Sequence, residues 1–195
     1  MKVSLLALAL SAAGLAAAPV LSHAAEGDNG GFFINGNVGQ SNLDKGVYND
    51  SDTGYGANIG YRWAINPNVA LGIEGGYTDL GKFGAKSGFA GLGLPQAKID
   101  GWNAGVNGHF NLTPNWYLSG RAGLFRADVK AGYLADPTTP AFVDDTSNKY
   151  YGGVGFGYDF SNNASIGLNY DYYKVNKSGV SFNPDLVSVS AEYRF

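Results

Sequence analysis

The chain has 195 residues, a formal net charge of −3 and no cysteine. The acidic balance argues against a nucleic-acid partner, and the lack of cysteine excludes disulfides and thiol chemistry. Glycine accounts for 30 residues, well above its usual ~7% share. Because the glycines lack collagen period and are mixed with aromatics in short alternating runs, the composition indicates β structure and tight turns.

The amino terminus has the features of a secretory leader. Met1-Lys2 precedes an apolar run from Val3 to about Ala18, and a small-residue sequence, Ser22-His23-Ala24-Ala25, follows. These features predict a cleaved signal peptide over residues 1–24, with cleavage after Ala25 as the alternative. Residues 25–195 then form one domain, in which His109 is the only histidine. No apolar run in it approaches the ~20 residues of a membrane helix.

The rest of the chain contains eight segments in which apolar and polar or small side chains alternate. Because strand side chains point to opposite faces with period two, each segment has one apolar face and one face of glycine, asparagine, serine and a few charges. The clearest run is Tyr55 to Asn66. The predicted strands cover residues 32–39, 55–66, 69–78, 101–110, 116–125, 150–160, 165–173 and 187–195.

The connections between these segments alternate in length. Tight turns are predicted near residues 67, 114 and 162, and longer loops near 41–53, 81–96, 129–148 and 174–186. In an antiparallel meander, all the short turns then lie at one end and all the long loops at the other. Membrane barrels show this asymmetry, with short periplasmic turns and longer external loops.

Packing volume decides which face points outward. The interior of an eight-stranded barrel is just wide enough to be filled by side chains, and the apolar faces carry all three tryptophans, Trp63, Trp102 and Trp116. These would overfill the lumen, so the apolar faces point outward into lipid; a soluble lipocalin-like barrel, the alternative, needs the reverse. We therefore predict an all-β, eight-stranded antiparallel up-and-down transmembrane β-barrel with two girdles of interfacial aromatics.

Two motifs resemble those of the OmpA-like, or opacity-like, outer-membrane β-barrel family. One is the run Gly153-x-Gly155-Phe156-Gly157-Tyr158-Asp159, and the other is the ending Ser190-Ala191-Glu192-Tyr193-Arg194-Phe195. The resemblance implies an integral outer-membrane protein that contacts outer-membrane lipid and lipopolysaccharide. Family members that anchor the envelope to peptidoglycan do so through a soluble domain after the barrel; this sequence departs from that pattern at Phe195, so we expect no such domain. In that family, the barrel-insertion machinery reads a terminal signal that corresponds here to Val189, Ala191, Tyr193 and Phe195.

Several charges are predicted inside the barrel, where an unpaired charge is costly. Arg62 and Glu74 lie on one face of adjacent strands, on either side of the Pro67-Asn68 turn. We expect them to meet and, with Arg121, to plug and rigidify the lumen. The alternative role is a gate, because OmpA-type barrels resemble this chain in having internal charge pairs whose rearrangement opens a small pore.

His109 is the one candidate for acid–base chemistry. It is predicted to point inward near the periplasmic turn at Thr113-Pro114, where the acyl chains acted on by lipid-modifying barrel enzymes do not reach. We expect no catalysis, no cofactor and no metal. The predicted function is a structural, surface-exposed role that presents four external loops. The alternatives are a small low-conductance pore for small or hydrophobic solutes, and an adhesin whose loops bind a host or other surface ligand.

Overall fold

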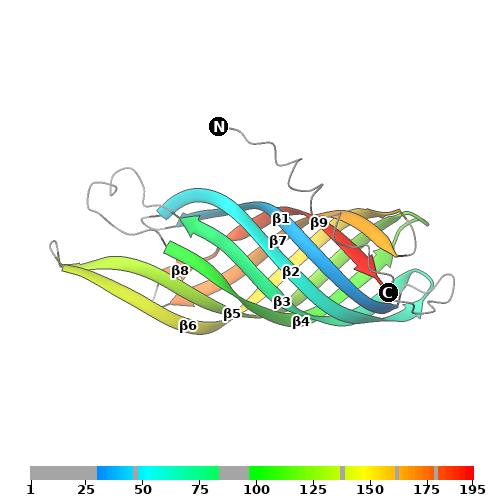
Figure 1. Ribbon diagram of the computed structural model, residues 1–195, viewed down its shortest axis with the longest axis horizontal. Helices are drawn as coiled ribbons and strands as arrows, with labels where there is room; N and C mark the ends of the chain where they lie inside the picture. Colours follow the sequence, from blue (N-terminus) through cyan, green and yellow to red (C-terminus); the bar gives the residue numbers. More distant parts are fainter. Residues whose placement is uncertain (1–29, 46–47, 84–96, 137–138, 161–162, 178–179) are drawn as a thin grey trace.

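The computed structural model describes residues 30–45, 48–83, 97–136, 139–160, 163–177 and 180–195. Within these ranges the chain forms antiparallel strands arranged as a long, narrow barrel (Figure 1). The strands are β1 (Gly31–Lys45), β2 (Tyr48–Asn66), β3 (Val69–Phe83), β4 (Ala97–Asn111), β5 (Trp116–Asp136), β6 (Thr139–Asp159), β7 (Ala164–Lys177), β8 (Val180–Phe182) and β9 (Asp185–Arg194).

Eight of these strands form a closed wall. Neighbours pair in the order β6-β5-β4-β3-β2-β1-β9-β7, and β7 also pairs with β6, which closes the sheet. Among the described strands, the short β8 pairs with β7 alone. The predicted eight-stranded antiparallel barrel is confirmed, and closure gives the wall no free edge of unpaired backbone groups. No helix in the described ranges is long and apolar enough to cross a bilayer.

The two ends of the barrel differ as predicted. Tight connections join β2 to β3 and β4 to β5 at one end, which we call the short-turn end, and the C-terminus lies there too (Figure 1). At this end the amide of Phe195 donates a hydrogen bond to the carbonyl of Phe32 at 2.8 Å. The last strand is therefore tied to the first.

The strands at the opposite, long-hairpin end extend further than the alternation predicts. β5 and β6 continue through most of residues 129–148, and β1 and β2 through most of 41–53. β4 pairs with β5 only as far as Lys130, and β7 pairs with β6 only as far as Tyr150. Beyond these residues β5 and β6 form a projecting two-stranded ribbon (Figure 1). The loop prediction is wrong here because a ribbon surrounded by water needs no apolar face, so its sequence carries no alternation signal.

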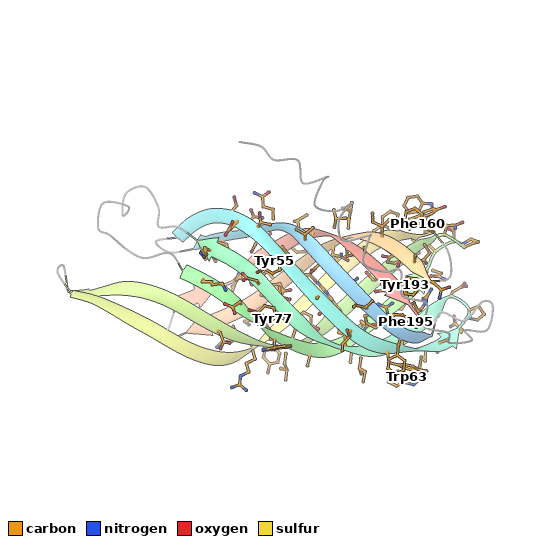
Figure 2. All side chains as sticks on the ribbon, viewed as in Figure 1. Tyr55, Trp63, Tyr77, Phe160, Tyr193 and Phe195 are labelled. Atoms are coloured by element: carbon orange, nitrogen blue, oxygen red, sulfur yellow. The ribbon has the colours of Figure 1, made fainter. Side chains whose placement is uncertain are left out.

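The outer face of the wall is apolar along most of its length. Ile59, Trp102 and Val154 are each 64–65% exposed, while the inward Asn58 and Asn103 are buried. Side chains project from the barrel all round in Figure 2. An apolar surface this extensive requires a lipid solvent, which agrees with the predicted orientation.

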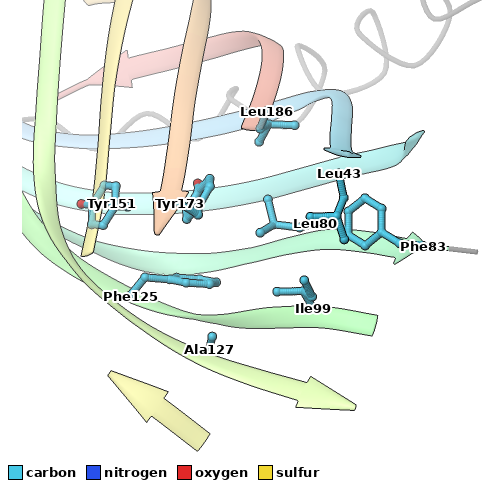
Figure 3. Packing of buried hydrophobic residues seen from close by; sticks show 9 residues of the cluster. All are labelled: Leu43, Leu80, Phe83, Ile99, Phe125, Ala127, Tyr151, Tyr173 and Leu186. Atoms are coloured by element: carbon cyan, nitrogen blue, oxygen red, sulfur yellow. The ribbon is translucent and has the colours of Figure 1, made fainter. Parts of the chain in front are cut away.

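Near the long-hairpin end this polarity reverses. Exposed outer positions there include Lys82, Arg126 and Lys174. The sequence predicts a polar lumen throughout, and this is wrong for the upper part, because that part of the wall stands in water and folds around an ordinary hydrophobic core. Fully buried side chains such as Leu80 and Phe125 contribute roughly 1.5–3 kcal/mol each. The upper cluster, shown in Figure 3, consists of Leu43, Leu80, Phe83, Ile99, Phe125, Ala127, Tyr151, Tyr173 and Leu186.

Candidate functional site

Below the upper cluster the lumen is polar and almost filled. The alternation of each strand directs asparagine, serine and charged side chains inward, and they line a cavity of about 40 Å³. This leaves room for only a few water molecules. The charged residues that line it include Arg62, Glu74, Arg121 and Glu192, so the predicted lumen residues do come together.

Arg62 reaches across the lumen from β2 to β9. Its two terminal nitrogens meet the two carboxylate oxygens of Glu192, one of them at 3.0 Å. Its Nε donates to Oδ1 of Asn107 on β4 at 2.6 Å, and the guanidinium carbon lies 4.0 Å from the centre of the Phe33 ring on β1. A bidentate pair and a cation–π contact fix the guanidinium. One side chain thereby links four strands of the wall.

Glu74 lies on the same inner face as Arg62, as predicted, but Arg62 forms its ion pair with Glu192 instead. Glu74 accepts a hydrogen bond from Oη of Tyr151 at 2.7 Å. The strand register places Arg62 opposite Gly72, which leaves it two positions from Glu74. The predicted Arg62–Glu74 ion pair is wrong because the long arginine side chain reaches across the lumen to the carboxylate of Glu192. Proximity on adjacent strands does not reveal a partner on a strand that is not a neighbour.

Arg121 on β5 pairs with Asp171 on β7, although β6 runs between them. Nε of Arg121 donates to Oδ1 of Asp171 at 2.6 Å, and Nη2 meets Oδ2. The intervening residue is Gly153, which is in register with both. A Cβ at this position would overlap Oδ1 of Asp171, so only glycine permits the close approach.

Two further glycines on the inner face of β6 also make room for side chains of the neighbouring strand. A Cβ on Gly155 would collide with the hydroxyl of Ser119, and a Cβ on Gly157 with the phenol ring of Tyr117. From Gly153 to Gly157 the inner face of β6 is therefore a strip without side chains, on which those of β5 lie. The Gly-x-Gly-x-Gly run over residues 153–157 thus has a packing role that the sequence alone did not reveal.

His109 is buried at the short-turn end, as predicted. Its Nε2 lies 3.2 Å from Oδ2 of Asp159, and its ring stacks on that of Tyr117 with 4.2 Å between centroids. The backbone carbonyl of Asp159 accepts a hydrogen bond from Nδ2 of Asn115 at 3.1 Å. The imidazole faces the lumen, and these contacts brace β4, β5 and β6 against one another.

The three tryptophans lie on the outer surface at two levels. Trp63 and Trp116 lie toward the short-turn end and Trp102 toward the long-hairpin end; Figure 2 labels Trp63. Trp102 packs edge to face on Tyr77 at 5.3 Å, and Trp116 stacks on Phe156 at 5.0 Å. Such rings suit the boundaries between lipid and water.

A network of both charge signs lies at the level of Trp102 and just above it on the outer surface. Oη of Tyr77 donates to Asp100 at 2.5 Å, and Oη of Tyr55 donates to Asp79 at 3.2 Å. Nζ of Lys98 lies 3.1 Å from Asp79 and 3.3 Å from Asp100. The hydrogen bond to Asp79 raises the pKa of Lys98 above the ordinary lysine value. The lipid-facing apolar surface of the barrel, which we call the apolar belt, therefore ends at this level.

The residues predicted as the insertion signal lie at alternate positions on β9 and at its end. They are Val189, Ala191, Tyr193 and Phe195. The rings of Tyr193 and Phe195 meet edge to face at 5.0 Å, and Figure 2 shows them at the end where the short turns lie. Their role in insertion stays a prediction.

The family description "Outer membrane protein beta-barrel domain" matches residues 5–195. The chain belongs to this family. No curated protein matches it. Among solved structures it is similar to Neisserial surface protein A (NspA), with 16% identity, a TM-score of 0.57 and coverage of 84% of this chain and 97% of that one. It is also similar to Ail, the attachment invasion locus protein of Yersinia pestis, with 16% identity, a TM-score of 0.54 and coverage of 84% and 99%. At this identity the likeness shows the fold alone.

Membership of the outer-membrane barrel family confirms the resemblance stated above and indicates a bacterial outer-membrane location. In such barrels the short turns are periplasmic and the longer connections external. The ion pairs of Arg62 and Arg121 then lie within the membrane, and the upper cluster and the β5–β6 ribbon lie at the external end.

Proposed function

We propose that this chain is a structural outer-membrane barrel that displays its external hairpins at the cell surface, without free conduction or catalysis. The closed lumen carries the proposal, because the pairs Arg62–Glu192 and Arg121–Asp171 cross it and leave a cavity of only about 40 Å³. The upper cluster fills the barrel above them. A lumen blocked at several levels supports bracing and display rather than transport.

The position of His109 supports a non-catalytic role. Its imidazole is buried inside the barrel beside Asp159, whereas the acyl chains of membrane lipids lie outside the wall. A lipid-modifying reaction needs its acid–base group on the lipid-facing surface. Mass-spectrometric analysis of lipid A from cells that overproduce the protein should therefore show no new acylation or deacylation product, and a modified species would contradict this part of the proposal.

Planar-bilayer recordings of the purified full chain test the closed lumen. We expect no steady conductance from barrels whose folding is confirmed by heat-modifiable migration on a gel. Regular single-channel steps from the unmodified chain would overturn the proposal and favour a low-conductance pore. Removing both halves of an ion pair, as in Arg62→Gln with Glu192→Gln, provides a positive comparison because it frees space in the same lumen.

A second candidate function, binding of a surface ligand, is favoured by the β5–β6 ribbon. Within the described residues, its strands extend beyond the last pairs with β4 and β7, at Lys130 and Tyr150. A two-stranded ribbon that stands clear of the wall exposes backbone edges on which another chain can add a strand. The pairing of β5 with β6 beyond the wall supports a role in contact with other surfaces.

The register of the ribbon allows a clean truncation. Lys130 is opposite Asp144, so joining them through Asn-Gly removes residues 131–143 and leaves a two-residue hairpin turn. We expect the shortened chain to insert normally but to lose attachment of expressing bacteria to cultured epithelial cells. A matched control replaces residues 46–47 with Asn-Gly at the tip of the β1–β2 hairpin. Unchanged attachment after removal of the ribbon would rule out this second function.

A further inference from the structure

Two cations on the outer wall lack a partner within the described part of the chain. Arg126 on β5 and Lys174 on β7 are both exposed, and neither forms an ion pair or hydrogen bond with another described residue. By contrast Lys98, two outer positions above Trp102 on β4, is held by two carboxylates. Desolvating a cation beside an apolar belt is costly unless an anion compensates it. Within the described residues neither cation has such an anion, so the pair is suited to an anionic group from outside the chain.

Aromatic residues frame the two cations at the upper edge of the apolar belt. Arg126 is opposite Trp102 of β4, and Lys174 is opposite Tyr150 of β6. The register places the two cations two strands apart and offset by two residues, which separates their backbones by roughly 12 Å. Their long side chains can hold one phosphate between them or one phosphate each. Asp128, the next outward position on β5, lies further from the belt.

Below the cations the wall is hollowed by small residues. Gly152 lies two positions below Tyr150 and faces Ala122 of β5, and Gly120 faces Gly108 of β4. A Cβ on Gly120 would meet no heavy atom within 4 Å, so the wall is open to the lipid there. The apolar groove that passes over Gly108, Gly120 and Ala122 has larger side chains as its walls: Trp63, Leu71, Ile73, Val106 and Phe110.

The distance from the cations to the groove floor matches one membrane leaflet. Arg126 and Gly120 are six residues apart on β5, which is roughly 15 Å along the membrane normal for a strand tilted by ~40°. The hydrocarbon core is about 30 Å thick, so this is about half of it. An acyl chain that starts at the level of Arg126 therefore ends in the groove.

We propose that the outer wall over β4–β7 is a binding site for a phosphorylated lipid of the outer leaflet. Arg126 and Lys174 bind its phosphates, the rings of Trp102 and Tyr150 flank the headgroup, and one acyl chain lies in the groove over Gly120. Because the cations lie at the external end of the barrel, a lipid bound to them belongs to the outer leaflet. The apolar groove below them favours binding of a lipid over free phosphate, because free phosphate has no acyl chain to place in the groove.

Native mass spectrometry of the purified full chain, titrated with diphosphoryl lipid A, tests the site. We expect the double variant Arg126→Gln with Lys174→Gln to bind this lipid roughly thirty-fold more weakly, since each cation near an anionic membrane surface contributes on the order of 1 kcal/mol. Gly120→Leu fills the groove and should weaken binding about five-fold. The loss is smaller because packing, not transfer from water, drives association in an apolar solvent.

Matched controls separate the site from general effects. Gly36→Leu adds the same side chain at a position on β1 that is equally open, and Lys82→Gln removes another exposed cation at the external end; we expect both to bind like the unmodified chain. Lipid A without phosphates should bind no more tightly than phosphatidylethanolamine. Equal binding by all variants, or displacement by inorganic phosphate alone, would overturn the proposal. Heat-modifiable migration confirms that each variant is folded.

Discussion

Arg121 and Asp171 face each other across the Cα of Gly153, so that three residues on three adjacent strands form one row inside the barrel. Asp171 is fully buried, and its carboxylate lies where the side chain of any other residue at position 153 would be. The ion pair therefore depends on a missing side chain as much as on the two that form it.

Replacing Gly153 by alanine should displace this carboxylate. We expect the free energy of unfolding to fall by about 3 kcal/mol, at the low end of the cost of breaking a buried ion pair. Urea titration of the barrel in lipid vesicles measures the change. Gly152→Ala is the control, because its Cβ would point outward and lie 3.8 Å from the nearest heavy atom. Equal stability of the two variants would show that the pair adapts without cost.

Removing Arg62 leaves the carboxylate of Glu192 buried without its partner. We expect Arg62→Gln to destabilise the barrel by about 3–5 kcal/mol, and the double change with Glu192→Gln to recover much of that loss. The same urea titration provides the double-mutant cycle. Glu74→Gln is the comparison, because it removes the partner first predicted for Arg62. If Glu74→Gln coupled to Arg62→Gln as strongly as Glu192→Gln does, the assigned pairing would be incorrect.

The upper cluster should behave as the core of a water-soluble protein. Leu80 is fully buried, so Leu80→Ala should lower the free energy of unfolding by about 2–5 kcal/mol. Leu118→Ala removes the same atoms from the outer wall, where the side chain is 43% exposed and lipid replaces the lost contacts, so we expect a smaller loss. Equilibrium unfolding of both variants in vesicles measures the difference. Losses of the same size would place Leu80 and Leu118 in equivalent surroundings.

The terminal aromatic residue should matter for assembly more than for stability. We expect Phe195→Ala to reduce the amount of heat-modifiable barrel in outer membranes several-fold, while the refolded purified variant stays close to the unmodified chain in its urea midpoint. The ring of Phe195 is only half-buried and meets the edge of the Tyr193 ring, so its loss costs less packing than the loss of a core residue. A midpoint that fell as much as assembly would make the effect structural rather than a lost insertion signal.

The alternation of residues 55–66 was sufficient to predict a strand and its orientation, because lipid on one side and a narrow lumen on the other select opposite residue types at every step. The same reasoning placed Arg62, Glu74 and Arg121 inside. It did not find the partners Glu192 and Asp171, since a long side chain can cross the lumen or a glycine gap to strands that are not its neighbours. Such contacts depend on barrel tilt and shear, which a single sequence does not show.

The upper part of the barrel was predictable only in outline for a different reason. Leu43 and Leu80 lie in stretches where the outward positions are polar or small, so their pattern is that of an ordinary soluble strand or a loop. Once the wall leaves the membrane, water lies outside and the apolar side must turn inward. The expected loop at 129–148 was wrong for the same cause, because hydrogen bonding along the ribbon needs no particular residue pattern.

The reversal of polarity near Trp102 also determines how deep the barrel sits. A shift of the barrel toward the cell exterior by one outer position is about 5 Å along the membrane normal for a tilted strand. It would move apolar side chains such as Ile73 toward water. A shift of the barrel toward the periplasm would move Lys98 and Asp79 into the hydrocarbon region. Both displacements are unfavourable, so the molecule keeps its vertical position, and a bilayer of different thickness has to stretch or thin around it.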